Sequence, residues 1–197
     1  LFTAIAILAP WFTGDPLLIQ PALRLKPPSE TAWWGTDHLG RDVFARAMHG
    51  TRMSLIVGFS VAVIAVIPGV AIGILAGMSR IGGAIVMRII DAMMAIPAVL
   101  LAIALAALLQ PGLTTVIIAI AVPEIPRMVR LVRSVVLSVR QQPYVDAAIS
   151  VGTHGPKLIW LHILPNTIAP VIVQATYAAA SAIIASAVLS FLGVGTP

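Results

Sequence analysis

The sequence predicts an all-α fold, a polytopic bundle of transmembrane helices. Hydrophobic residues make up 59% of the 197 residues and charged residues only 10%, whereas a soluble domain carries about 25% charged residues. The apolar residues gather into five long runs, and about twenty apolar residues cross a bilayer as a helix. The runs are apolar throughout, so they lack the alternation that marks the shorter strands of a membrane barrel.

The first three runs set the order of the expected helices. A signal peptide has a basic segment before its apolar core, and the run Leu1–Phe12 shows none. We expect this run to be the end of a truncated first membrane helix. The run Leu55–Gly77 contains 23 residues without a charge, and at 1.5 Å per residue it would extend roughly 35 Å. A short turn at Gly82-Gly83 leads to the third run, about Met87–Leu109, which contains Pro97.

The fourth run can reach membrane length only if it includes charged residues. It begins at Leu113, after a tight turn at Gln110-Pro111-Gly112. We expect it to include Glu124, Arg127 and Arg130. Charges within a membrane helix are candidates for a functional site. Glu124 and Arg127 are three residues apart and can pair on one helix face, and we favour a structural pair over a substrate site.

The fifth run, about Thr167–Leu192, completes the expected spans. The chain ends on Gly195-Thr196-Pro197 without a charged tail, and we expect both ends to be cut. We expect one domain over 1–197, with an external loop at about 13–54 and a cytoplasmic loop at about 134–164. Asp91 and Arg88, three apart at the start of the third run, are also expected to pair.

Small residues recur on one face of the second run. Gly69, Gly73 and Gly77 are spaced by four, which places them on the same side of a helix. Small faces allow helix backbones to approach closely in lipid. We therefore expect these glycines to serve helix packing. The small residues at 178–182 and at 185–187 predict the same for the last span.

The basic residues give a weak preference for orientation. Alternating crossings place seven on one side of the membrane and five on the other, and the positive-inside rule makes the richer side cytoplasmic. The cytoplasmic set is Arg80, Arg88, Arg127, Arg130, Arg133, Arg140 and Lys157, and the opposite set is Arg24, Lys26, Arg41, Arg46 and Arg52. The basic residues are spread along the whole chain, and no cluster of them lies beside aromatic residues, which argues against nucleic-acid binding.

The first informative polar segment runs from Gly35 to Asp42 and reads Gly-Thr-Asp-His-Leu-Gly-Arg-Asp. Glycine and aspartate favour turns, and Asp42 suits the N-cap of a short helix from Val43. The segment is either an ordered external loop whose charges pair with each other or a ligand-binding loop. It lacks the Lys-Ser/Thr pair of a phosphate-binding P-loop.

The second polar segment predicts two short helices that meet at a glycine. Pro143 suits the first turn of one helix, and Gly152 suits its end. Thr153 can cap a second helix that runs through Pro156 and ends near Pro165. Ala147-Ala148 would leave a shallow surface, with apolar area from Ile149 and Val151. The segment suits either docking in a groove of another protein or an interfacial position on lipid.

This second segment resembles the EAA loop of ABC importer permeases, because Asp146-Ala147-Ala148 is followed by Gly152 and then by Leu164-Pro165. The Gly35–Asp42 segment and the Val after it are similar to the external loop of the oligopeptide, dipeptide and nickel permeases. Asp91 with Ile96-Pro97, and the closing Ser190-Phe191-Leu192-Gly193, are similar to the same subgroup. Two positions depart from the pattern. Asp146 replaces the usual Glu, and His162 replaces the Ile of the wider family.

The resemblance implies a MetI-like permease fold with six helices, of which five are expected in this chain. It implies that the second segment docks on separate ATPase subunits through Tyr144, Asp146, Ala147, Ala148, Gly152, Lys157 and Pro165. It implies that the external loop, with Gly35, Asp37, Gly40, Arg41 and Asp42, lies near the docking face for an extracytoplasmic substrate-binding protein. A second, related permease chain is also implied.

No catalytic or metal site is expected in this chain. It lacks a Walker A motif and has only two lysines, Lys26 and Lys157, so ATP and Mg²⁺ would bind the partner ATPase. It also lacks the Gly-x-Ser-x-Gly and His-Glu-x-x-His motifs of hydrolases. The expected function is the permease subunit of an ATP-driven importer for peptides, nickel or a related solute. The rival is an ion-coupled secondary transporter or channel subunit, which would need no such loop.

Overall fold

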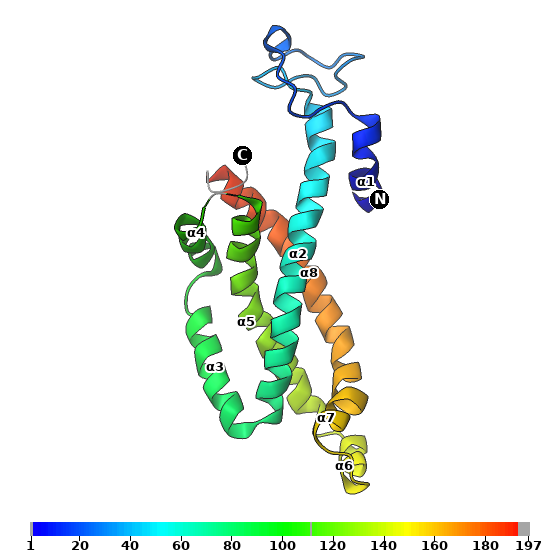
Figure 1. Ribbon diagram of the computed structural model, residues 1–197, viewed down its shortest axis with the longest axis vertical. Helices are drawn as coiled ribbons and strands as arrows, with labels where there is room; N and C mark the ends of the chain where they lie inside the picture. The colour runs from blue at the N-terminus through cyan, green and yellow to red at the C-terminus, as the bar shows by residue number, and fades with distance from the viewer. Residues whose placement is uncertain (1, 111, 193–197) are drawn as a thin grey trace. The chain divides into compact units, whose positions relative to one another are not determined.

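The computed structural model describes residues 2–110 and 112–192, and its regular elements in these ranges are all helical (Figure 1). The all-α class is therefore confirmed. Pro111 of the expected turn and Gly193 of the closing motif lie outside the described residues. The helices are α1 Phe2–Phe12, η1 Pro21–Leu23, α2 Val43–Met78, α3 Arg80–Met94, α4 Ala98–Leu108, α5 Leu113–Val139, α6 Pro143–Ser150, α7 Gly155–Leu158, the π-helical η2 Ile159–Ile163 and α8 Leu164–Phe191.

The described chain forms two compact units, which divide between Ile56 and Val57 inside α2. The single domain expected from the sequence stays a prediction. In the first unit, the hydroxyl of Thr13 donates to the carbonyl of Ala9 at 2.7 Å and lies 3.2 Å from His49 Nδ1. The rings of Trp33 and Trp34 pack on Phe44, with centroid distances of 5.0 and 5.2 Å. These contacts tie the loop to the first turns of α2.

Helix α5 is the centre of the second unit, where it packs against α8, α4 and α3. Its buried residues fall into two clusters. One, which includes Val116 and Ala119, joins α5 to α4, α8 and the middle of α2. The other, which includes Val132 and Val136, joins α5 to the last turns of α2 and to α6, α7 and η2. Figure 1 shows α6 and α7 at the end of this unit where α2 turns into α3.

The three glycines of α2 lie against α5. A Cβ atom on Gly69 would overlap the side chain of Met128, one on Gly73 would lie 2.7 Å from Val132 Cβ, and one on Gly77 would lie 2.6 Å from Val136 Cγ1. The glycines of α2 and the residues of α5 that face them are each spaced by four along their helix. An i±4 row of α5 therefore packs along an i±4 row of α2. The absence of side chains on α2 is what permits this close approach.

The number of spans differs from the five expected. By length and composition, α2 and the continuous helical stretch Gly155–Phe191 qualify as membrane spans. Helices α3 and α4 give a third only if counted as one span that bends by 83°. The bend falls at Pro97, which cannot donate a helical hydrogen bond and ends the preceding helix. Thr3–Phe12 is a shorter apolar helix. Helix α5 has 27 residues, but its charges lower its apolar content.

Two helix boundaries expected from the sequence were wrong. The helix expected from Val43 does begin there, capped by Asp42, but it is not short: it continues without a break through the run Leu55–Gly77 and ends at Met78. Gly82-Gly83 is not the turn between spans, since both glycines lie in α3. The turn is at Ser79, whose hydroxyl accepts from the backbone N–H of Gly82 at 3.1 Å.

Candidate functional sites

The polar segment after α5 folds as a short helix with a defined beginning and end. Helix α6 starts at Pro143, whose missing N–H is one that a first turn leaves unpaired in any case. After Ser150 the backbone N–H of Gly152 donates to the carbonyl of Ile149, and that of Thr153 donates to Ala148, both at 2.9 Å. These two bonds form a Schellman motif. Gly152 has φ +89°, which a residue with a Cβ adopts only under strain.

The second half of the loop differs from the two separate helices expected. His154, not Thr153, is the N-cap of α7, and its side chain makes no capping bond. Helix α7 then continues without interruption through η2 into α8, so it does not end near Pro165. The wider π turn lies directly before Pro165, whose ring would clash with a carbonyl in a regular α-helix. The loop is thereby joined directly to a membrane span.

Helix α6 has one buried and one exposed face. Val145 is fully buried and Ala148 is 8% exposed, and both pack in the cluster with α5, α7 and η2. Ala148 therefore contributes to the core, and only Ala147 of the alanine pair lies at the surface. Tyr144 is 43% exposed, and its ring lies 6.3 Å from that of His162 in η2. Ile149 and Val151 carry further exposed apolar area.

We define the α6 surface as six of the exposed residues of this loop, Tyr144, Asp146, Ala147, Ile149, Val151 and Gly152. Lys157 and Pro165, which were grouped with them from the sequence, are also exposed, on α7 and α8. Asp146 lies in the first turn of α6, where the helix dipole favours a negative charge. The α6 surface is thus a small, mainly apolar protrusion whose opposite face is buried against the helix bundle.

Arg140 fixes the same end of the bundle, which the sequence did not indicate. As the C-cap of α5, it donates from Nη1 to the carbonyls of Gly77 at 2.8 Å and Met78 at 3.2 Å. These are carbonyls of the last turn of α2, which have no partner within their own helix. Arg140 therefore joins the ends of α2 and α5, beside the start of α6. From the sequence, Arg140 entered only the count of basic residues on the cytoplasmic side, whereas the structure gives it a specific contact between two helices.

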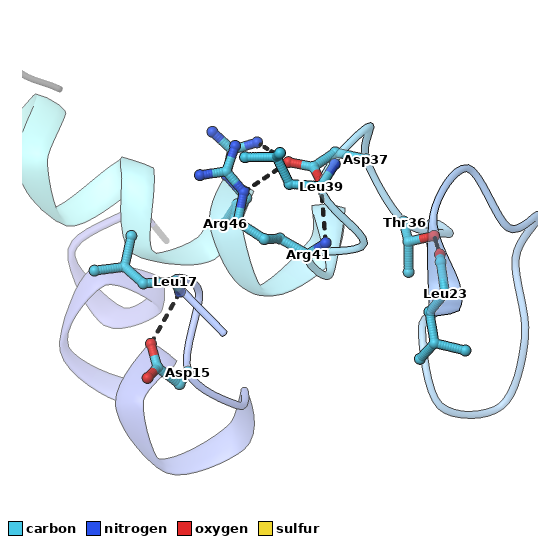
Figure 2. A network of polar contacts seen from close by, with 8 residues as sticks. All are labelled: Asp15, Leu17, Leu23, Thr36, Asp37, Leu39, Arg41 and Arg46. Carbon is cyan, nitrogen blue, oxygen red and sulfur yellow. Dashed lines mark hydrogen bonds and ion pairs between the residues drawn. The ribbon is translucent and has the colours of Figure 1, made fainter. Parts of the chain in front are cut away.

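The external loop is organised around one carboxylate, Asp37 (Figure 2). Its Oδ1 accepts the backbone N–H groups of Leu39 at 2.7 Å and Arg41 at 3.0 Å. Its Oδ2 accepts Nε of Arg41 at 2.8 Å and Nη1 of Arg46 at 2.6 Å. Desolvation on its own would raise the pKa of Asp37, but the backbone and side-chain hydrogen bonds and the charge of Arg41 hold that pKa well below its usual range.

Other members of the external loop maintain its shape. Asp42 caps α2 by accepting the N–H of Phe44 at 2.9 Å. Gly35 and Gly40 have φ of +74° and +77°. A Cβ on Gly40 would overlap the backbone of Gln20, and one on Gly35 would lie 2.6 Å from the carbonyl oxygen of Lys26. In the same region the hydroxyl of Thr36 donates to the carbonyl of Leu23, as Figure 2 shows. Among the charged residues of the loop, Arg41 and Arg46 both pair with Asp37, as the interpretation of an ordered loop with internal ion pairs expects.

Two ion pairs lie on α5. The expected pair of Glu124 and Arg127 is present, with Arg127 Nη1 donating to Glu124 Oε1. The expected pair of Asp91 with Arg88 was wrong: Asp91 of α3 instead accepts Nη2 of Arg130 at 2.5 Å. The spacing of three residues on one helix made the Arg88 pair plausible, whereas a contact between helices cannot be read from sequence spacing.

Two cavities in the second unit meet at Arg127. One, of about 280 Å³, lies among α4, α5 and α8 and includes Glu124, Arg127 and Ser181 in its lining. The other, an open cleft of about 610 Å³, is lined by residues of α3, α5 and α8 that include Arg127, Arg130 and Tyr177. The sequence could not identify these linings, since they depend on how the helices pack.

Two apolar helices of membrane-spanning length, with an exposed loop beside them, define a multi-pass membrane protein. Residues 69–197 match the family described as the binding-protein-dependent transport system inner membrane component. The chain belongs to this family, and it is accordingly a multi-pass component of the inner membrane. The match covers the glycine face of α2, α5 and the whole α6 surface.

Individual relatives align over nearly the whole chain. It is 53% identical over 193 residues to the probable peptide ABC transporter permease protein y4tQ of Sinorhizobium fredii, which covers 98% of this chain and 66% of the relative. It is 44% identical to the dipeptide transport system permease protein DppC of Alkalihalophilus pseudofirmus, over 98% of this chain and 64% of the relative. It is 38% identical to the oligopeptide transport system permease protein OppC of Bacillus subtilis, over 100% and 65%. The chain thus spans slightly less than two thirds of the length of these relatives.

Proposed function

We propose that this chain is the membrane-spanning part of a permease subunit in an ATP-driven importer, and that its solutes are short peptides. Membership of the family supports the transport role. The relatives named as peptide, dipeptide and oligopeptide permeases support peptides over nickel as the solute class. The chain itself carries out no chemical reaction, and ATP hydrolysis takes place on a separate chain.

The observation that carries the proposal is the construction of the α6 surface. Its base is buried through Val145 and Ala148, so the helix cannot rock independently of α5. Its outer side exposes Ile149 and Val151, the latter at 85%. Apolar side chains on a loop outside the membrane are a common mark of a docking surface. A fixed protrusion joined to α5 and α8 suits the transfer of motion from a docked partner to two membrane helices.

The partners follow from this role. The α6 surface docks in a groove of an ATPase subunit, which binds ATP and Mg²⁺. A second, related permease subunit completes the pathway. The external loop, held rigid by Asp37, lies near the docking face for a substrate-binding protein. Lipid surrounds the apolar helices, and no cofactor binds to this chain.

The test is ATP-dependent peptide uptake. The full-length protein, the second permease and the ATPase subunits would be reconstituted in proteoliposomes with the substrate-binding protein outside and ATP inside. We expect accumulation of a labelled dipeptide that stops when ATP is replaced by a non-hydrolysable analogue. A proton or sodium gradient without ATP should give no accumulation. Uptake driven by an ion gradient alone would contradict the proposal and favour an ion-coupled transporter.

A further inference from the structure

Polar side chains in the second unit follow one face of α5 and one face of α8. On α5 they are Glu124, Arg127, Arg130 and Ser134, and on α8 they are Gln174, Tyr177 and Ser181. The α8 positions are separated by three and four residues, which keeps them on one side of the helix. All seven line one or both of the two cavities described above. Polar groups in membrane helices are costly and usually mark a pathway or a binding site.

The two cavities adjoin at Arg127, which lines both of them, and together we call them the α5–α8 groove. Along α5 the groove extends from Ile120 in one cavity to Ser134 in the other. Fourteen residues at 1.5 Å each correspond to about 21 Å, which is about two thirds of the hydrocarbon thickness of a bilayer. The two cavities together therefore extend along much of the hydrocarbon thickness.

Arg127 lies where the two cavities meet, and its ion pair does not use its full bonding capacity. Its Nη1 donates to Glu124, and its side chain remains 38% exposed. A guanidinium group has five N–H donors. Glu124 is much more buried, at 6%, and its Oε2 has no hydrogen-bond partner among the described residues. An ion pair that served only the fold would be expected to satisfy both of its members.

We propose that the α5–α8 groove is this chain's share of the solute path and that Arg127 binds the carboxylate of a passing solute there. Arg127 donates from Nη1 to Glu124 and presents its remaining N–H donors to the groove. A planar guanidinium matches a carboxylate with two parallel hydrogen bonds, which an ammonium group cannot do. The solute class that fits is a peptide with a free carboxyl terminus. This inference rests on the proposed function.

The first part of the test uses the absence of cysteine from these 197 residues. Single substitutions Ser134→Cys, Tyr177→Cys and Ser181→Cys place thiols in the groove. Val173→Cys is the control, because this α8 residue is 69% exposed but does not line either cavity. A charged, membrane-impermeant thiol reagent should label the groove cysteines in the assembled transporter, and dipeptide with ATP should slow that labelling several-fold. Groove cysteines as unreactive as Val173→Cys would show that lipid or another helix covers the groove, and would overturn the inference.

The second part measures recognition of the carboxylate. Initial uptake of a dipeptide and of its C-terminal amide is compared at concentrations that saturate the substrate-binding protein with either. The ratio of the two rates should fall about tenfold or more in the double variant Glu124→Gln/Arg127→Gln, since a hydrogen bond to a charged group is worth roughly that factor. Arg127→Lys, which keeps the charge without the planar fork, should lower the ratio less. Arg88→Gln removes an exposed charge from α3 and should leave the ratio unchanged.

The outcomes separate this inference from the proposed function. If the wild type takes up no peptide, the proposed function fails. If the wild type takes up peptide and the variants, at equal assembly with the ATPase, keep its ratio, the carboxylate site at Arg127 is overturned while the importer role stands.

Discussion

The contact between the glycine face of α2 and helix α5 predicts a measurable cost for adding one methyl group. In the substitution Gly73→Ala the new Cβ would lie 2.7 Å from Val132 Cβ, 2.9 Å from Val132 Cγ1 and 3.0 Å from the carbonyl oxygen of Val129. Val132 is fully buried and β-branched, so it cannot rotate away. The two helices must separate, and overpacking of this kind typically costs about 1–3 kcal/mol.

A matched exchange on the same helix isolates that packing cost. Gly50 also lies in α2, and no atom lies within 4 Å of a Cβ added there. Replacing a helical glycine by alanine stabilises the helix by roughly 0.5–1 kcal/mol at either site. Gly50→Ala should therefore be more stable than the wild type. Because the propensity gain cancels, the difference between the two variants should equal the packing cost of about 1–3 kcal/mol.

The assay is reversible unfolding of the full-length protein in mixed micelles, with α-helix content as the signal. The second-site change Val132→Ala should restore part of the loss in Gly73→Ala, which a double-mutant cycle would report as a favourable coupling. If Gly73→Ala is as stable as Gly50→Ala, the helices do not approach as closely as described, and the argument from the glycine face is refuted.

Three further predictions concern the loops. Asp37→Asn should raise the rate of amide hydrogen exchange across the external loop at pH 7. The folded-state pKa of Asp37 is depressed, so its carboxylate stabilises the folded loop at neutral pH. The wild-type loop should therefore lose protection from exchange only as the pH falls below the unfolded-state pKa of about 3.9. Arg140→Ala should destabilise the fold by about 1–2 kcal/mol in the same unfolding assay, because two carbonyls at the end of α2 lose their donor. Val145→Ala should lower the free energy of unfolding by about 2–3 kcal/mol, because the loss of two buried methyl groups leaves a cavity beneath α6. An equal loss in Val151→Ala, at a residue that is 85% exposed, would contradict the assignment of the buried and exposed faces.

Local sequence signals were sufficient where the structure depends on neighbouring residues. Pro143 and Gly152 marked the ends of α6, and Asp42 marked the start of α2. The pairing of Glu124 with Arg127 followed from a spacing of three residues within one helix. In each case the determinant is a cap, a positive φ or a helix face, and these act within a few residues of the chain.

Sequence signals failed where the outcome depends on packing between helices. Asp91 pairs with Arg130, which is 39 residues away, because α3 packs against α5. Ala148 looked like surface from its small size, yet it is buried against the core of the unit. The continuity of α7 with α8 was missed because Pro165 suggests an end, whereas the π turn before it accommodates the ring. The groove around Arg127 could not be expected, since its two sides come from separate helices.

The central claim is that the α6 surface couples this chain to an ATPase, and copurification tests it most directly. The full-length protein would be expressed with its candidate ATPase subunits, and the amount of ATPase retained would be compared for the wild type, Ala147→Asp and Gly152→Asp. The control is Ala22→Asp, the same exchange at an exposed alanine of the external loop. We predict that the wild type and the control retain the ATPase, while the two α6 variants insert into the membrane but lose it. Equal retention by all four proteins, or no retention by the wild type, would contradict the account.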